Sequence, residues 1–258
     1  MNAIEKKMVE ILRTLRDHHG VTAVKTSFET EDVQLFELLR TMEIALTAGV
    51  GLLVKLGGCE AWTDIRTAKA FGAGSILGPM IESRFALEKY LEMCERSYSA
   101  EERTEMKFLI NIETTDGCDK IDQILSAYNL NMLHGVVLGR TDLCNDLNTK
   151  DVDSAEILKV ARELFTKVKE QSLRCLVGGG VTPKSAPFMQ QLEGLIDGFE
   201  TRKIVFTDYS KAKYNMEEGI RLALQYELCW FELKQQYYGD RFHEDNGKIK
   251  GLTQYSLS

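Results

Sequence analysis

Short apolar runs alternate along this chain with longer stretches in which apolar residues recur every three or four positions. Runs of four to eight residues next to glycine are typical of strands buried on both faces. They span 21–28, 51–56, 74–81, 107–112, 133–139, 173–180 and 202–206. The intervening stretches have helical spacing. Two examples are Leu35, Leu38, Leu39, Met42 and Leu46, and Ile157, Val160, Ala161, Leu164 and Val168.

Alternating strands and helices predict right-handed crossovers and a parallel sheet. Seven strand–helix units within about 200 residues favour an α/β fold of the (β/α)8 TIM-barrel type over an open sheet. The pattern supplies only seven clear strands, so we expect the eighth to be degenerate or hidden near the N-terminus. No stretch with the composition of a linker divides residues 1–258, so we predict a single barrel domain.

The two ends of the chain lie outside this alternation. Residues 1–20 are predicted to form an N-terminal helix, and residues 209–258 a C-terminal helix followed by a polar tail. The helix is rich in aromatic residues and carries an apolar stripe. The stripe consists of Met216, Ile220, Leu224, Leu228 and Phe231. Such a helix can close the barrel or pack on a neighbouring subunit, and the sequence leaves both open.

Composition narrows the class of protein. The 258 residues include 44% hydrophobic and 28% charged residues, with a formal net charge of −7. No basic stripe marks a nucleic-acid binder, and no apolar run reaches the roughly 18 residues of a membrane span. The charged N-terminal residues do not resemble a signal peptide. We therefore expect a soluble, cytoplasmic protein without nucleic-acid or membrane partners. Its four histidines exclude a His-rich metal site.

Charged residues follow several of the predicted strands at the point where each strand ends. They are Glu29, Lys55, Glu82, Glu113 and Asp142. In a parallel barrel all of these strand ends lie on one face, so the five side chains converge on one mouth. The alternative is that each lies separately in a solvated loop.

Two of these carboxylates come from neighbouring predicted strands. Glu113 and Asp142 could share one ion, and two carboxylates completed by water and substrate oxygens suit Mg²⁺ or Mn²⁺ better than Zn²⁺. The alternative is structural: Glu113 caps the next helix and Asp142 pairs with Arg140.

A glycine run lies after the sixth strand, in the segment VGGGVTP at 177–183. Gly179 and Gly180 would let the backbone approach an anion at a helix N-terminus, as in a phosphate site. The run is equally explained by a tight turn that needs positive φ.

Three segments carry a family resemblance. The stretch FLINIETTDGCDKIDQILSAYNLNMLHGVVLGRTDLCNDL (108–147) combines an IET strand end with a GRTDL element about 30 residues later. Upstream lie ILGPMIESRFALEKY (76–90) and LLVKLGG. Together they resemble the HpcH/HpaI aldolase and citrate-lyase β family over residues 21 to about 207.

The resemblance implies a phosphoenolpyruvate/pyruvate-type barrel with Mg²⁺ or Mn²⁺ on Glu113 and Asp142. In that family the ion chelates the carboxylate and keto oxygen of a pyruvate-like 2-oxo acid, and a carbon–carbon bond is made or broken through the enolate. The backbone from Gly139 to Thr141 would face the substrate carboxylate. Asn111 is similar to a polar position that lines the family's pocket.

The chain departs from the family pattern at several positions. Lys55 stands where arginine is usual, and it supplies the charge without the bidentate fork. The stretch around Glu29 lacks the histidine that the family's aldolases use in proton transfer. Arg140 replaces a small residue or proline. The segments with Glu60 and Arg202 look specific to a subgroup, and these residues could belong to the site or form structural salt bridges.

We therefore expect a metal-dependent carbon–carbon lyase or aldolase, an aldehyde-lyase or oxo-acid-lyase. Lys55 would contact the substrate's oxygen or carboxylate, Arg140 would offset developing charge, and Glu29 could act as base. Glu82 would line the mouth, and the glycine run could seat a phosphorylated or sugar-type aldehyde.

Two other functions stay open: a citryl- or malyl-type thioester lyase, and a barrel without turnover that serves as a binding or assembly subunit. The resemblance also implies a homo-oligomer, a trimer or hexamer.

Overall fold

The computed structural model describes residues 1–29, 31–238 and 243–256, and its strands fall within the seven predicted apolar runs and one further segment. The strands are β1 (Val21–Ser27), β2 (Gly51–Lys55), β3 (Ser75–Gly78), β4 (Lys107–Ile112), β5 (Leu133–Gly139), β6 (Arg174–Gly178), β7 (Gly198–Glu200) and β8 (Ile204–Phe206). They close a barrel in sequence order. The predicted TIM-type α/β barrel with an additional C-terminal helix is confirmed.

The eighth strand is β7, a three-residue strand between the sixth and seventh predicted runs. It is therefore degenerate, and it does not lie near the N-terminus. The expectation of a wholly parallel sheet was wrong at one strand, because β8 is antiparallel to both β7 and β1. Only residues 201–203 separate β7 from β8, and a parallel crossover needs a dozen residues or more. The amide of Thr201 donates to the carbonyl of Ile204, at 2.9 Å, and closes this turn.

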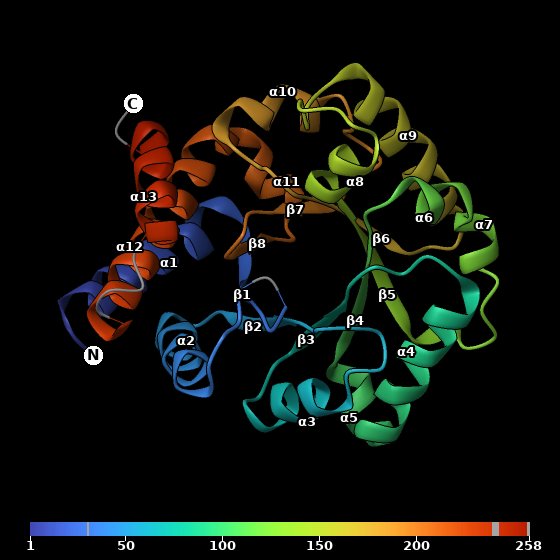
Figure 1. Ribbon diagram of the computed structural model, residues 1–258, viewed down its shortest axis with the longest axis horizontal. Helices are drawn as coiled ribbons and strands as arrows, with labels where there is room; N and C mark the ends of the chain where they lie inside the picture. The colour runs from blue at the N-terminus through green and yellow to red at the C-terminus, as the bar shows by residue number, and fades with distance from the viewer. Residues whose placement is uncertain (30, 239–242, 257–258) are drawn as a thin grey trace.

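The helices surround the strands, and Figure 1 shows α1, α12 and α13 together on one side of the barrel. Their bounds are α1 (Ala3–His19), α2 (Leu35–Ala48), α3 (Trp62–Ala70), α4 (Arg84–Ser97), α5 (Ala100–Glu105), α6 (Thr115–Asp119), α7 (Ile121–Ile124), α8 (Arg140–Asp146), α9 (Ala155–Glu170), α10 (Ala186–Gln190), α11 (Tyr209–Ala212), α12 (Met216–Tyr238) and α13 (His243–Ser256). Among the described residues, no helix has the length and apolar character that crossing a membrane requires.

The aromatic helix α12 packs against α1 and α13 of its own chain. Trp230 and Phe231 on α12 are buried, so this helix covers the side of the barrel where the chain begins and ends. The segment expected to be a polar tail forms helix α13 instead, as far as Ser256. Tertiary contacts with α12 stabilise this helix, although its polar sequence does not predict them.

The predicted apolar face of α2 was wrong in part. Leu38 is fully buried, whereas Leu35, Leu39 and Leu46 are exposed. The buried face of this helix, which packs on α1 and the strands, instead carries Leu38, Thr41, Ile44, Ala45 and Ala48.

One apolar side chain from each of seven strands fills the lower lumen of the barrel. This layer consists of Ala23, Leu53, Leu77, Leu109, Val137, Leu176 and Val205. Successive strand residues alternate between the two faces of a sheet, so the next residues that face the lumen lie two positions further along each strand. In β1, β2, β4, β5 and β6 these are Lys25, Lys55, Asn111, Gly139 and Gly178, and Glu200 of β7 faces the lumen beside its pairing partner Val205. The lumen therefore changes from apolar to polar toward the carboxyl ends of the strands.

Candidate active site

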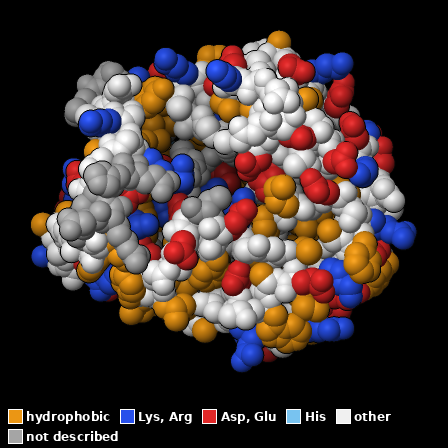
Figure 2. All heavy atoms as spheres, viewed as in Figure 1, with side chains coloured by type: hydrophobic (Ala, Val, Ile, Leu, Met, Phe, Trp, Pro, Cys, Tyr) orange, Lys and Arg blue, Asp and Glu red, His pale blue; other side chains and the backbone are white. Residues whose placement is uncertain are grey.

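Glu113 lies at the end of β4 with its carboxylate held from three directions. The amide of Met80 donates to Oε1 at 3.0 Å, and Asn111 Nδ2 donates to Oε2 at 2.7 Å. Lys55 Nζ lies 3.5 Å from Oε1. Only 3% of Glu113 is exposed. Figure 2 shows acidic and basic side chains gathered around a hollow near the middle of the drawn face.

Met80 presents its amide to Glu113 through an unusual backbone conformation. Its φ of 52° is in the left-handed region, which non-glycine residues seldom adopt. The turn after β3 therefore carries strain at a residue that contacts the carboxylate, and such strain is common at functional sites. The sequence motif GPMIES marked this turn but gave no sign of the backbone contact.

Lys55, at the end of β2, bridges two carboxylates. Its Nζ lies 3.2 Å from Glu29 Oε2 as well as 3.5 Å from Glu113 Oε1. Burial lowers the pKa of Lys55, but the neighbouring charges of Glu113 and Glu29 outweigh burial, and the pKa is raised. Lys55 is therefore a charged ammonium suited to anion binding, and it is poorly suited to nucleophilic attack as a free amine.

Asp142 lies in the first turn of α8 and is exposed. It makes no hydrogen bond or ion pair with the described part of the chain. The pKa of Glu113 is raised, first by burial and further by the charge of Asp142, against the opposing effects of Lys55 and the two hydrogen-bond donors. The charge of Asp142 thus acts on Glu113 between the neighbouring strands β4 and β5.

The structural alternative for these carboxylates does not hold. Thr114, and not Glu113, caps α6, because its side chain accepts a hydrogen bond from the amide of Gly117 at 3.2 Å. Arg140 forms its ion pair with Asp153 and not with Asp142.

The oxygen atoms at this place fit a hard divalent cation. Glu113 and Asp142 supply two carboxylates, and the buried Oδ1 of Asn111 has no hydrogen-bond partner in the described structure. Mg²⁺ is commonly held by one or two carboxylates, with water and substrate completing the octahedron. No group of three or more His, Cys, Asp or Glu ligands occurs among the described residues, so a fully protein-ligated metal centre is not the kind of site found here.

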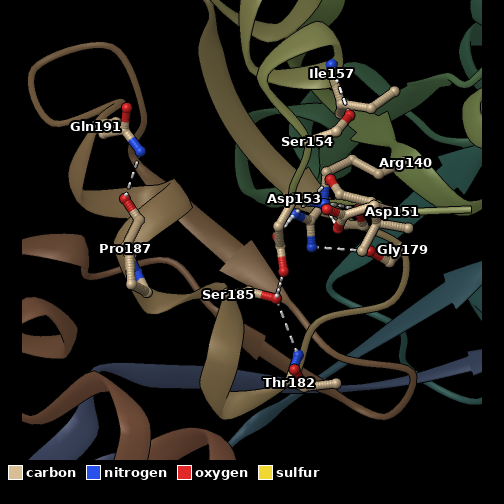
Figure 3. Close-up of polar contacts among 12 residues, drawn as sticks. Arg140, Asp151, Asp153, Ser154, Ile157, Gly179, Thr182, Ser185, Pro187 and Gln191 are labelled. Atoms are coloured by element: carbon tan, nitrogen blue, oxygen red, sulfur yellow. Dashed lines mark hydrogen bonds and ion pairs between the residues drawn. The ribbon is translucent and has the colours of Figure 1, made fainter.

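Arg140 occupies a different position from the one expected. Its guanidinium is fully buried and donates to the carbonyls of Gly178 (3.1 Å) and Gly179 (2.9 Å), and it pairs with Asp153. It also lies 4.6 Å from the ring centroid of Phe188. In Figure 3, Arg140 and Asp153 point toward each other, and Ser185 donates to the second oxygen of Asp153 at 2.8 Å.

These contacts correct the prediction that the Arg140 side chain offsets charge on the substrate. The guanidinium is enclosed by protein acceptors and fastens the loop after β5 to the loop after β6. The chain bends at Gly179 and Gly180, whose φ angles are 75° and 64°, and the carbonyls of Gly178 and Gly179 meet the guanidinium beside this bend. The glycine run is thus explained by its turn. A 3-10 turn at Pro183–Ser185 and the five-residue helix α10 follow it, and a phosphate at this position stays a prediction.

The other predicted residues lie at or near the mouth. Glu82, after β3, accepts a hydrogen bond from Thr114 Oγ1 at 2.7 Å and so stands beside Glu113. Thr141 is exposed in the first turn of α8. Glu60 is exposed in the loop after β2. Arg202 forms an ion pair with Glu227 of α12 at 2.9 Å, which is the structural salt bridge that the sequence analysis gave as one of two roles.

A second lysine–glutamate pair in the lumen was missed. Lys25 of β1 forms an ion pair with Glu200 of β7, and the two side chains are 13% and 3% exposed. The sequence indicated Lys25 only as a single charged residue inside the apolar run 21–28, two positions after Ala23 and therefore on the same face of the strand. Glu200 belongs to a strand of three residues, which is too short to show a period.

Comparison with known proteins agrees with this architecture. The family model described as HpcH/HpaI aldolase/citrate lyase matches residues 23–177, more than half of the chain. No match to a curated protein was found.

Three solved structures share the fold at low sequence identity. An HpcH/HpaI aldolase from Desulfitobacterium hafniense DCB-2 has 14% identity and a TM-score of 0.59, covering 83% of this chain and 88% of its own. An HpcH/HpaI aldolase/citrate lyase family protein from Burkholderia cenocepacia J2315 has 12% identity and a TM-score of 0.62, covering 86% and 89%. The citrate synthase SbnG has 15% identity and a TM-score of 0.59, covering 84% and 89%.

Proposed function

Because the chain belongs to the HpcH/HpaI aldolase/citrate lyase family, we propose that it is a carbon–carbon lyase acting on a pyruvate-like 2-oxo acid with the help of Mg²⁺ or Mn²⁺. The observation that carries the proposal is the placement of Glu113 and Asp142 after neighbouring strands. One of these carboxylates is buried and the other has no partner in the described structure. The strand-end pattern in the sequence suggests both carboxylates as metal ligands, and this assignment is part of the proposal.

The side chains have separable roles in this proposal. Glu113 and Asp142 would hold the cation, which when bound offsets negative charge developing on the keto oxygen of the donor. Lys55 would bind the donor's carboxylate, because its neighbours keep it protonated. Asn111 orients Glu113 through the 2.7 Å hydrogen bond from Nδ2. The backbone of Gly139–Thr141 would face the donor, whereas the Arg140 side chain keeps this loop in place.

The proposal is tested by titrating metal-free protein with Mn²⁺, with and without oxalate, which mimics the enolate of pyruvate. We expect oxalate to bind only when Mn²⁺ is present. Glu113→Gln and Asp142→Asn should each weaken Mn²⁺ binding by at least about tenfold, since each removes one anionic ligand.

Asp146→Asn is the matched control, because Asp146 lies one turn further along α8 and accepts a hydrogen bond from the amide of Thr115 at 2.8 Å. It should leave Mn²⁺ affinity unchanged. If wild-type protein binds neither Mn²⁺ nor oxalate in the millimolar range, the proposal is wrong.

Titration with other ligands distinguishes the proposed lyase from the two alternatives, a thioester lyase and a binding subunit without turnover. The solved relatives include proteins described as aldolases and one described as a citrate synthase, so pyruvate and citrate are both tested as ligands. A thioester lyase should respond to acetyl-CoA. A barrel that serves only as a binding subunit should respond to none of these ligands.

We also propose that the chain forms a homo-oligomer, a trimer or hexamer. Leu35, Leu39 and Leu46 on α2 are 60%, 47% and 69% exposed, which supports an interface on this helix. Light scattering gives the mass directly, and a monomer at micromolar concentration would contradict the proposal.

A further inference from the structure

A groove on the outer surface of the barrel combines an exposed indole ring with positive charge. It lies between α3 and the end of α4, two helices that contact each other on the outside of the barrel (Figure 1). Its volume is about 440 Å³, and its lining residues are Trp62, Arg66, Lys69, Ala70, Arg96 and Ser97. Neither Glu113 nor Asp142 is among them, so the groove is separate from the proposed metal site.

Three of the lining residues are cationic and none is acidic. Lys69 is neutralised in place, because its Nζ lies 2.7 Å from Glu102 Oε2 and donates to the carbonyl of Ser97 at 2.9 Å. Arg66 and Arg96 are exposed and form no ion pair or hydrogen bond with the described part of the chain. A guanidinium stays charged at any physiological pH. The groove therefore carries two uncompensated positive charges, although the formal net charge of the chain is −7.

The acidic residue that senses Arg96 is engaged elsewhere. Glu92 lies one turn earlier on α4 and accepts hydrogen bonds from Tyr128 Oη at 3.1 Å and from Lys89 Nζ at 3.3 Å. These two hydrogen bonds lower the pKa of Glu92 more than the charge of Arg96 does. Glu92 is thus committed to other partners, and Arg96 keeps its charge for a ligand.

The indole of Trp62 supplies an aromatic surface beside these charges. Trp62 is the first residue of α3 and is 40% exposed. Arg66 follows it at the i, i+4 spacing, which places the two side chains next to each other on one face of the helix. Among the described residues, no second ring stacks on this indole and no lysine or arginine lies over it. Its exposed part is therefore open to a ligand.

An aromatic surface next to two free guanidinium groups fits a nucleotide. Nucleic-acid bases stack on exposed aromatic side chains, whichever base is present, because every base has a π face. Guanidinium groups bind phosphate through paired hydrogen bonds. Inorganic phosphate alone would leave the indole uncovered, and an uncharged aromatic compound would leave both arginines without a partner.

The size of the groove also favours a small molecule over a protein partner. Its volume falls within the range of about 300–1,000 Å³ that is typical of small-molecule sites. A stable protein interface uses roughly 20–30 residues from each partner, whereas six residues line this groove.

We propose that the groove between α3 and α4 binds a nucleoside diphosphate, with the base against Trp62 and the phosphates at Arg66 and Arg96. This site goes beyond the proposed lyase function and does not depend on it, because no residue of the barrel mouth takes part.

The test titrates metal-free protein with ADP, so that the proposed metal site plays no part. Isothermal titration gives the affinity, and we expect a dissociation constant below about 1 mM. Adenosine lacks the phosphates and pyrophosphate lacks the base, so each should bind at least about tenfold more weakly than ADP. Tryptophan fluorescence, excited where adenine does not absorb, should be quenched by ADP. Trp62 should account for this quenching, because the second tryptophan, Trp230, is buried.

Three variants separate the base from the phosphates. Trp62→Ala should weaken ADP binding by at least about tenfold and leave pyrophosphate binding unchanged. Trp62→Phe keeps a ring, so it should bind ADP within about threefold of wild type while the fluorescence quenching is lost. Arg66→Met/Arg96→Met should weaken ADP and pyrophosphate alike, by at least about tenfold. All three positions are exposed, and thermal unfolding checks that each variant is folded.

The matched controls are two exposed residues of the same helix α4 that do not line the groove. Arg84 pairs with Glu88 at 3.5 Å, and Phe85 is 66% exposed. Arg84→Met and Phe85→Ala should each bind ADP as wild type does. Weaker ADP binding in Arg84→Met, equal to that in the groove variants, would mean that ADP responds to general surface charge and that the site is wrong.

Other results would also overturn the proposal. If pyrophosphate binds as tightly as ADP, or if Trp62→Ala keeps the wild-type affinity, the groove is at most an anion site and not a nucleotide site. If wild-type protein does not bind ADP and Trp62→Ala changes the mass measured by light scattering, the groove is an interface between copies of the chain. None of these results bears on the proposed lyase, which stands or falls with the titration of Mn²⁺ and oxalate.

Discussion

A Cβ atom on Gly139 would lie 2.6 Å from both the Cβ atom and Oε2 of Glu113. Two non-bonded carbon atoms are normally separated by about 3.5–4.0 Å, so the Glu113 side chain can occupy its place only because residue 139 has none. The glycine of the GRTDL segment thus makes room for the carboxylate of the IET segment. The two motifs, about 30 residues apart in the sequence, form one unit in space.

Gly139→Ala should therefore damage the metal site more than the fold. The new methyl group would displace Glu113 from the donors Met80 and Asn111, and we expect Mn²⁺ affinity to fall by at least about tenfold. Gly74→Ala is the control, since a Cβ atom there meets nothing within 4 Å. Isothermal titration gives the affinity and thermal unfolding gives the stability. Wild-type affinity in Gly139→Ala would mean that Glu113 is not a ligand.

Lys55→Met should strengthen Mn²⁺ binding and weaken oxalate binding. The ammonium lies 3.5 Å from Glu113 Oε1 and repels a cation bound to the same carboxylate. Removing it should raise Mn²⁺ affinity by about tenfold and lower the oxalate affinity of the loaded protein by a similar factor. Lys69→Met, on the surface, is the control. Weaker Mn²⁺ binding in Lys55→Met would contradict the competition between ammonium and metal.

The strand-end argument found Glu29, Lys55, Glu113 and Asp142 because it depends on topology alone. Once strands are parallel in a barrel, their carboxyl ends share one face, whatever the details of packing. The direction of β8 could not be predicted by the same argument. Residues 202 and 203 of the turn belong to the run 202–206 that predicts a seventh strand, and the pairing of β8 with β7 and β1 reveals the reversal.

The role of Arg140 could not be inferred from local sequence. The acceptors that enclose its guanidinium include Gly178 and Asp153, which lie 38 and 13 residues further along the chain. Their meeting depends on the bend at Gly179, a backbone property that the glycine run permits without specifying. Lys25 was missed for a different reason, since the apolar pattern around it identified a strand but not which face lines the lumen.

Acidification should destabilise the protein through His19 and His134. Burial lowers the pKa of His19, with the carbonyl of Asn215 opposing, and burial likewise lowers the pKa of His134. For each histidine the pKa in the folded protein lies below the pKa in the unfolded chain. Between these two values the unfolded chain binds more protons than the folded protein, so stability is lost as pH falls below about 6.5. Each histidine contributes a slope of at most about 1.4 kcal/mol per pH unit.

The measurement is urea unfolding at several pH values, with His19→Gln compared with His18→Gln. The His19 substitution should flatten the pH dependence. The neighbouring His18 is exposed, and its replacement should change little. An unaltered slope in His19→Gln would show that this histidine does not titrate on unfolding.

Arg140→Lys should destabilise the fold while leaving the metal site intact. A lysine cannot reproduce the guanidinium fork that contacts Gly178, Gly179 and Asp153, so buried acceptors lose their donors. We expect the free energy of unfolding to fall by about 2–4 kcal/mol. Mn²⁺ affinity should stay within about threefold of wild type, because the guanidinium is bonded to Gly178, Gly179 and Asp153 and to neither of the proposed ligands.

The control for this change is Arg162→Lys, since Arg162 donates to a single backbone carbonyl, that of Gln191, on the surface. Urea unfolding and Mn²⁺ titration of the two variants separate a structural role from a chemical one. If Arg140→Lys unfolds like wild type yet binds Mn²⁺-dependent oxalate poorly, the guanidinium must reach the substrate. The enclosure of Arg140 by its carbonyl and carboxylate partners argues for the opposite result, because a side chain with no exposed surface can act on a ligand only through the loops that it holds.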